Sequence, residues 1–137
     1  DGSGSYTKAE LLRAIKGVMA WAMPDTIRTL DYEGTYTDID HSDHHTAAYF
    51  TREASKAYRR HHMLVGYQGY QATTLPVNLR PDELTRLKAS AFFAYAQHDP
   101  LACTGPEACD SFLYAKELKR QYSLPVKLPP APKPLLL

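Results

Sequence analysis

The sequence has 137 residues, of which 44% are hydrophobic and 23% are charged, a globular composition that excludes an intrinsically disordered chain. Its 16 basic and 15 acidic residues leave a net charge of +1. This balance argues against nucleic acid or an anionic membrane as the main partner, because both require a concentrated basic field. No apolar stretch approaches the roughly 20 residues that a membrane-spanning helix needs.

The first expected element is a helix that begins at a capping box formed by Thr7 and Glu10. Apolar residues then recur at helical spacing and predict one buried face, made of Leu11, Leu12, Ile15, Val18, Met19 and Ala22. Pro24 and Asp25 end this helix. The β-branched run 26–30 predicts a short buried strand directly after it.

A polar loop, residues 31–42, follows the predicted strand. A second helix is expected from about Asp43, with Ser42 or Asp43 as its N-cap. Its predicted inner face consists of Phe50, Ala54, Ala57 and Tyr58. Ligands of open α/β sheets bind beyond the carboxyl ends of the strands, so the position of this loop favours a functional role.

The second half of the chain predicts further alternation of strand and helix. Residues 63–71 have the pattern of a strand, and Pro81 with two acidic residues marks the start of a helix. That helix is expected to run through Leu84, Leu87, Ala91 and Tyr95. A short helix within 111–122 and a proline-rich linker or tail, 125–137, complete the chain. The whole pattern predicts an α/β layer architecture for residues 1–124.

Cys103 and Cys109 flank a Gly-Pro turn signal. Two thiols so placed are expected to close a small disulfide loop, which indicates a secreted or extracytoplasmic protein. The alternative is two unrelated thiols. Neither cysteine belongs to a CxxC pair, so no thiolate zinc site is expected.

Residues 37–48, TDIDHSDHHTAA, contain three histidines and three aspartates. His41 and His44 are three positions apart, as in HxxH pairs that share a metal ion. Zinc accepts imidazole nitrogen and carboxylate oxygen, and a catalytic zinc ion has three protein ligands. The candidate third donors are Asp38, Asp40 and Asp43, and the spacing does not select among them. The alternative is a polar loop without function.

Residues 28–54 resemble the second conserved block of the PIG-L (N-acetylglucosaminyl-phosphatidylinositol deacetylase-like) family. The lead-in is MPDTIRTLD, and the motif is His41-Ser42-Asp43-His44, with serine where the family has proline. The flanking segments 4–15 and 78–99 also resemble helices of the family, so that the resemblance covers most of residues 5–122.

The resemblance implies a zinc-dependent hydrolase that removes the N-acetyl group from an N-acetylglucosamine-type sugar derivative. It makes His44 the zinc ligand. It makes His41 the residue that stabilises the tetrahedral oxyanion or protonates the leaving amine, and Asp43 the residue that orients His41. His45 has no assigned role in the family. It is interpreted either as a residue that contacts the metal ligands without binding the metal itself or as a surface residue.

One departure from the family is serious. PIG-L enzymes also carry an N-terminal His-Pro-Asp-Asp block, which supplies a histidine and an aspartate to zinc and an aspartate as general base, and no such block occurs in this sequence. The chain, which begins at Asp1, is therefore expected to be the C-terminal portion of such a protein. Its fold is expected to be an incomplete Rossmann-like sheet with flanking helices, without its N-terminal strands and inactive by itself.

Two other functions stay open at this point. One is a non-catalytic sugar-binding or structural module that keeps the fold. The other is a small autonomous metal-binding protein that uses His41, His44 and a loop aspartate. Tyr36, Tyr67 and Tyr70 are candidates for stacking on a sugar ring, although tyrosines at strand positions more often pack in a core or an interface.

Overall fold

The computed structural model describes residues 4–80, 82–98 and 115–126. These residues form a mixed α/β structure with a small parallel sheet of two strands, which confirms the predicted fold class at this level. The chain divides into two compact units, one made of residues 1–69 and 123–137 and the other of residues 70–122. No helix within the described ranges is long and apolar enough to cross a membrane.

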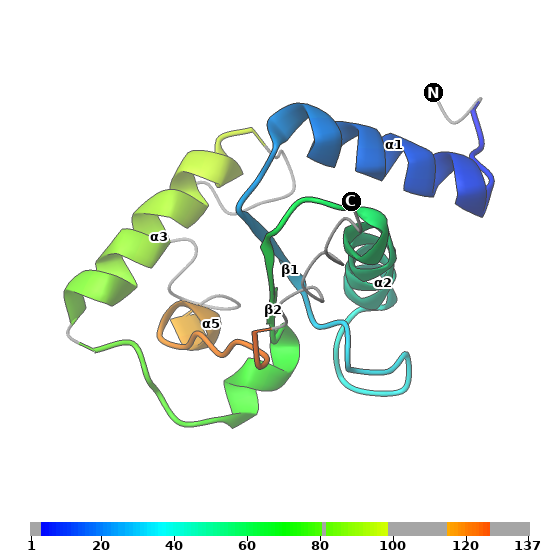
Figure 1. The fold of residues 1–137 in the computed structure, drawn as a ribbon. Coiled ribbons are helices and arrows are strands. Elements are labelled where there is room, and N and C mark those ends of the chain that lie inside the picture. Colours follow the sequence, from blue (N-terminus) through cyan, green and yellow to red (C-terminus); the bar gives the residue numbers. More distant parts are fainter. Residues whose placement is uncertain (1–3, 81, 99–114, 127–137) are drawn as a thin grey trace. The chain divides into compact units, whose positions relative to one another are not determined.

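Helix α1, Lys8–Ala22 (Figure 1), opens the first unit. It begins with the predicted capping box. The Thr7 hydroxyl accepts a hydrogen bond from the Glu10 amide at 3.3 Å, and the Glu10 carboxylate accepts one from the Thr7 amide at 2.8 Å. Met23 ends the helix in a left-handed conformation, with φ at 48°. The buried face is narrower than predicted, because Met19 is buried but Val18 and Ala22 are exposed.

Strands β1, Thr26–Leu30, and β2, Met63–Tyr67, pair in parallel from Thr26 opposite Met63 to Leu30 opposite Tyr67. Parallel strands require a crossover connection, and α2, Ser42–Ala57, provides it. The result is a β-α-β unit, seen edge-on in Figure 1. The strand predicted over 63–71 is too long, because the chain leaves the sheet after Tyr67.

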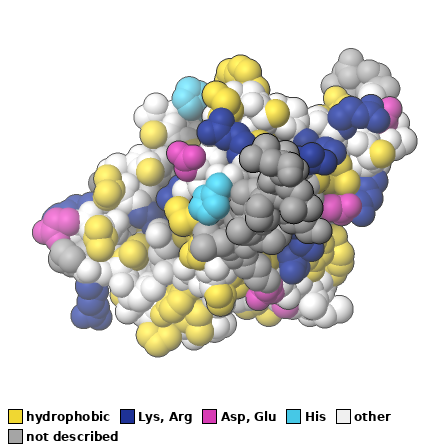
Figure 2. Space-filling model, in the orientation of Figure 1, with side chains coloured by type: hydrophobic (Ala, Val, Ile, Leu, Met, Phe, Trp, Pro, Cys, Tyr) yellow, Lys and Arg dark blue, Asp and Glu magenta, His cyan; other side chains and the backbone are white. Residues whose placement is uncertain are grey.

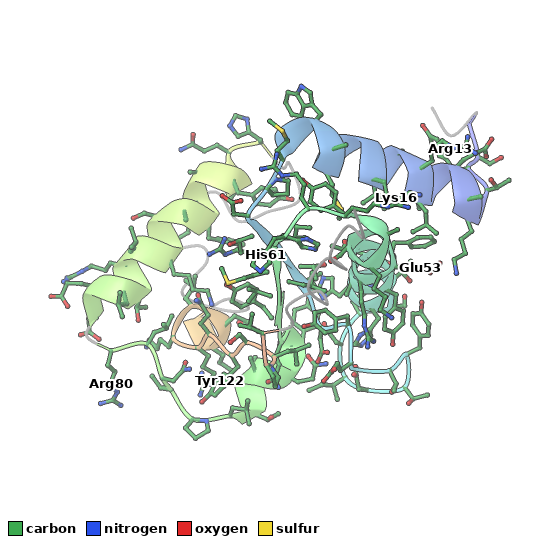
Figure 3. The ribbon with its side chains drawn as sticks, viewed as in Figure 1. Arg13, Lys16, Glu53, His61, Arg80 and Tyr122 are labelled. Atoms are coloured by element: carbon green, nitrogen blue, oxygen red, sulfur yellow. The ribbon has the colours of Figure 1, made fainter. Side chains whose placement is uncertain are left out.

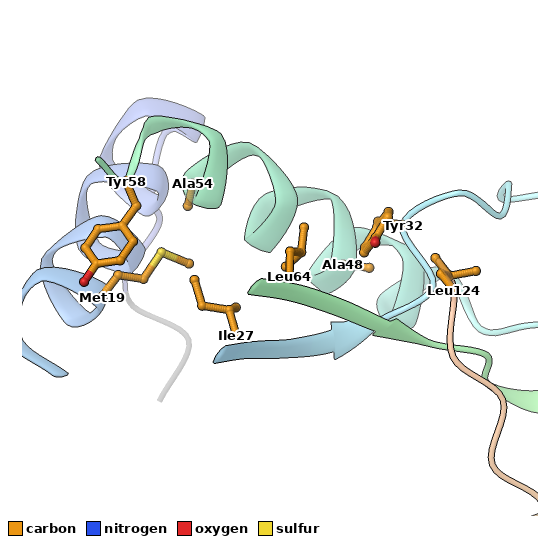
Figure 4. Close-up of a cluster of buried hydrophobic side chains, with 8 residues drawn as sticks. All are labelled: Met19, Ile27, Tyr32, Ala48, Ala54, Tyr58, Leu64 and Leu124. Carbon is orange, nitrogen blue, oxygen red and sulfur yellow. The ribbon is translucent and has the colours of Figure 1, made fainter. Parts of the chain in front are cut away.

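The core of this unit lies between α2, α1 and the two strands (Figure 4). Its buried members are Met19, Ile27, Tyr32, Ala48, Ala54, Tyr58, Leu64 and Leu124. Gly66 of β2 has to be a glycine, because a Cβ there would lie 2.7 Å from the Tyr32 ring and 2.9 Å from Leu124. The predicted inner face of α2 is right for Ala54 and Tyr58, whereas Phe50 is half-buried and Ala57 is exposed.

The second unit contains the 3-10 helix η1, Tyr70–Thr74, α3, Asp82–Ala96, and α5, Ala115–Leu118. Helix α3 agrees with its prediction, but three of its apolar side chains, Leu84, Leu87 and Tyr95, are exposed, and hydrophobic groups are visible over this helix in Figure 2. The helix predicted over 111–122 ends at Leu118. The Lys119 carbonyl instead accepts hydrogen bonds from the Asn78 and Leu79 amides at 3.3 and 3.1 Å.

Three earlier predictions lie outside the described residues: the disulfide between Cys103 and Cys109, residues 111–114 of the last helix, and residues 127–137 of the tail.

Candidate functional site

Aspartate side chains stabilise the loop that connects β1 to α2 by accepting hydrogen bonds from its backbone amides. The Asp31 carboxylate accepts hydrogen bonds from the Glu33 and Gly34 amides, both at 2.8 Å. The Asp38 carboxylate accepts one from the Thr35 amide at 3.1 Å. Because the loop starts at the carboxyl end of β1, these contacts hold it where α/β proteins commonly bind ligands.

Helix α2 begins one residue earlier than the sequence indicates. His41 is its N-cap, because the His41 carbonyl accepts hydrogen bonds from the His44 and His45 amides at 3.0 and 3.3 Å. The prediction of Ser42 or Asp43 as N-cap is therefore wrong. His41 nevertheless lies just before the helix and His44 in its first turn, as expected. Their ring centroids are 5.9 Å apart, so the two imidazoles are neighbours at the start of α2.

Each aspartate of residues 37–48 pairs with a different histidine. The Asp40 carboxylate lies 2.7 Å from His44 Nδ1, and the Asp38 carboxylate lies 2.9 Å from His45 Nε2. The third pair is longer, with 3.5 Å between His41 Nδ1 and the Asp43 carboxylate. The sequence did not distinguish the three aspartates as metal donors, and the structure separates them by their partners.

His45 is fully buried between the loop and α2, so its interpretation as a surface residue is wrong. Its Nδ1 lies 3.1 Å from the Asp31 carbonyl, and its Nε2 faces the Asp38 carboxylate. A carbonyl and an ionised carboxylate only accept hydrogen bonds, so both ring nitrogens donate when the imidazole is protonated. The Asp38 hydrogen bond, supported by the Asp31 carbonyl, raises the pKa of His45 against the opposing effect of burial.

Close packing also connects His45 to the loop. A Cβ at position 34 would lie 2.5 Å from His45 Cε1, so the loop passes the imidazole only as glycine. The Tyr49 ring stacks on His45 with 6.0 Å between centroids, and the Tyr49 hydroxyl donates a hydrogen bond to the Gly34 carbonyl. His45 therefore has a structural role: its hydrogen bonds and packing connect the β1–α2 loop to α2, the helix that carries His44.

The stability of the chain is expected to fall as pH rises above about 6.5, the ordinary pKa of histidine. Below that pH His45 is protonated in both the folded and the unfolded chain, and the stabilisation by Asp38 is fully present. As pH rises through the higher pKa of the folded state, this stabilisation is lost. Urea unfolding between roughly pH 6 and pH 9, with chelator present, measures it. The Asp38→Asn variant should show a smaller loss, and parallel curves for the two proteins would contradict this account.

His44 is partly open to solvent and pairs with a buried carboxylate. Its side chain is 32% exposed, whereas the Asp40 side chain beside it is fully buried. An ionised carboxylate accepts the Nδ1 proton, which places the lone pair of neutral His44 on Nε2. Metal-bound histidines usually donate their other ring nitrogen to a carboxylate or a carbonyl in this way.

His41 and Asp43 are the accessible members of the cluster, with 61% and 83% of their side chains exposed. Tyr36 is exposed as well, and its ring makes edge contacts with His45 and Tyr49. A side chain that contacts a substrate has to be reachable from solvent, and these three residues satisfy that condition. Tyr67, the other tyrosine of this unit proposed to stack on a sugar, is half-buried.

His44 fits zinc as one ligand, but one ligand is not a catalytic site. Within residues 4–80, 82–98 and 115–126, no group of three or more histidine, cysteine, aspartate or glutamate side chains is placed to hold a metal ion. Asp38 and Asp40, two of the candidate third donors, contact His45 and His44 instead. The pairing of Asp40 with His44 was missed in the sequence, although the position of Asp40 four residues before a helical histidine is a usable signal.

No family model, curated protein or solved structure matches this chain. The resemblance of residues 28–54 to the PIG-L family thus has no support from these comparisons.

Proposed function

We propose that this chain is part of a zinc-dependent hydrolase that removes the acetyl group from an N-acetylglucosamine-type sugar derivative. The supporting observation is the arrangement at the start of α2. His41 and His44 lie with their rings 5.9 Å apart, and the Asp43 carboxylate lies beside His41. The PIG-L-like motif His41-Ser42-Asp43-His44 needs this arrangement: one metal ligand, one second imidazole, and one carboxylate that orients the second imidazole.

The proposed roles follow from the positions of the side chains. His44 would hold the metal through Nε2, because Nδ1 faces the Asp40 carboxylate. Zinc, when bound, acidifies a water molecule and polarises the acetamide carbonyl. His41, exposed and without a cap bond of its own, donates a hydrogen bond to the oxyanion of the tetrahedral intermediate or gives a proton to the leaving amine. The Asp43 carboxylate, 3.5 Å from His41 Nδ1, is proposed to orient the ring.

The remaining metal ligands and the general base are proposed to lie on upstream sequence, in a His-Pro-Asp-Asp block. In the same proposal, the β1-α2-β2 unit belongs to a Rossmann-like sheet that further strands from that segment complete. A disulfide between Cys103 and Cys109 would place the protein outside the cytoplasm.

Acetate release by the complete protein, meaning this chain joined to its native upstream segment, tests the proposal. N-acetylglucosamine and its glycosides are the substrates, and acetate is measured directly. Chelation should abolish release and added zinc should restore it. Release that persists unchanged after verified removal of metal would contradict the zinc mechanism. Binding of the sugar by the zinc-loaded protein without any acetate release would favour the non-catalytic sugar-binding module.

A further inference from the structure

Asp40 occupies an unusual position for a loop carboxylate. Its side chain is fully buried, and one of its oxygens, Oδ1, accepts two hydrogen bonds. One comes from the His41 amide at 2.9 Å and the other from His44 Nδ1 at 2.7 Å. A single carboxylate oxygen thus joins the backbone of one residue of the cluster to the ring of another.

The carboxylate is also held from the carboxyl end of the neighbouring strand. Gly69 follows β2, and a Cβ at that position would lie 2.1 Å from Asp40 Oδ2 and 2.6 Å from its Cγ. Only glycine leaves room for the Asp40 carboxylate beside this segment of the chain. Asp40 therefore has a defined place and orientation, set by elements that are distant in the sequence.

We infer that Asp40 is a positioning residue for a divalent metal ion: it fixes His44 in the Nδ1–H tautomer and presents Nε2 to the metal. This inference rests on the proposed function for the role of His44. It assigns Asp40 to the support of a ligand, whereas the sequence had offered it as a direct metal donor. The chemistry is that of a carboxylate–histidine–metal arrangement, in which the carboxylate makes the ligating nitrogen more basic.

Two alternatives explain the geometry less well. As a direct ligand, Asp40 would have to turn an oxygen toward solvent, but its side chain is fully buried and Oδ1 already holds two donors. As a helix cap alone, Asp40 would need only the His41 amide, and the bond to the His44 ring would have no purpose. The ring bond is the shorter of the two.

The tautomer of His44 tests the inference in the 137-residue chain without any metal. Neutral histidine in water favours the Nε2–H tautomer. A free His44 and a His44 positioned by Asp40 would therefore carry the ring proton on different nitrogens. Long-range proton–nitrogen NMR spectra at neutral to mildly alkaline pH should show the proton on Nδ1 of His44. In Asp40→Ala, the Nε2–H form should gain population. A parent His44 in the Nε2–H form would overturn the inference, and this result requires no variant to fold.

Zinc titration of the complete protein, in which the upstream segment supplies the other proposed ligands, is the second measurement. Zinc should shift the His44 Nε2 resonance in the parent protein. Asp40→Asn keeps an oxygen acceptor but loses the charge, so it should keep the tautomer and bind zinc about tenfold more weakly. Glu53→Gln is the matched control, because Glu53 (Figure 3) is an exposed carboxylate on α2, the helix that carries His44, and it pairs with Lys8 far from His44 in the sequence. Equal zinc affinity in Asp40→Asn and Glu53→Gln, or no zinc-induced shift at His44 in the parent, would overturn the inference.

These results are separable from the fate of the proposed enzyme. An Nδ1–H tautomer together with zinc binding weakened by Asp40→Asn supports the inference even if the complete protein releases no acetate. Conversely, acetate release that depends on zinc while His44 carries its proton on Nε2 would keep the enzyme and remove the role of Asp40.

Discussion

His45→Ala is expected to lower the free energy of unfolding by about 3 kcal/mol. The substitution removes a fully buried imidazole and leaves a cavity beside the Tyr49 ring. It also leaves the Asp38 carboxylate and the Asp31 carbonyl without the ring donors that they face. The Asp38 side chain is 26% exposed, so water partly compensates for the lost charge pair, and the expected effect lies at the lower end for such losses.

Urea unfolding below about pH 6.5, where His45 is protonated, is the appropriate measurement. His61→Ala is the matched control, because His61 is an exposed histidine just before β2 (Figure 3) and should change stability by less than about 0.5 kcal/mol. If the His45→Ala protein were as stable as His61→Ala, the contacts of His45 with the loop would not contribute to the stability of the fold.

His44→Ala in the complete protein should abolish zinc-dependent acetate release, because it removes a metal ligand. His41→Ala should behave differently. It should keep zinc and lower kcat by about 10²–10³-fold, the usual loss when one donor to an oxyanion is removed. The expected difference follows from the proposed roles: His44, held by the buried Asp40 carboxylate, is the proposed metal ligand, whereas the His41 side chain is 61% exposed and is the proposed donor to the substrate.

Zinc content and steady-state kinetics, measured on the same preparations, separate the two roles. His61→Ala again serves as the histidine control and should retain both zinc and activity. Loss of zinc in His41→Ala, or full activity in His44→Ala, would reverse or refute the assignments that the motif implies.

The parts of the fold that were predicted correctly depend on local sequence. The capping box of Thr7 and Glu10 is a local four-residue motif, and α1 begins directly after Thr7 as it predicts. The β-branched run 26–30 has the same bounds as β1. The strand over 63–71 was predicted too long because aromatic alternation continues past Tyr67. The strand ends at Tyr67, and two residues later Gly69 lies against the Asp40 carboxylate.

The candidate site was predictable in its residues but not in its contacts. The spacing of His41 and His44 placed them correctly around the first turn of α2. The burial of His45 was not predictable, because hydrophobic periodicity counts histidine as polar and its partners, Asp31 and Asp38, lie 14 and 7 residues away. Likewise, three aspartates in one loop look equivalent until the fold gives each a different histidine.

A zinc-edge anomalous difference map from crystals of the complete protein tests the central claim most directly. We expect a zinc peak about 2.1 Å from Nε2 of His44, with Nδ1 of the same ring on the Asp40 carboxylate. A zinc ion bound elsewhere, with His44 outside its coordination sphere, would contradict the account.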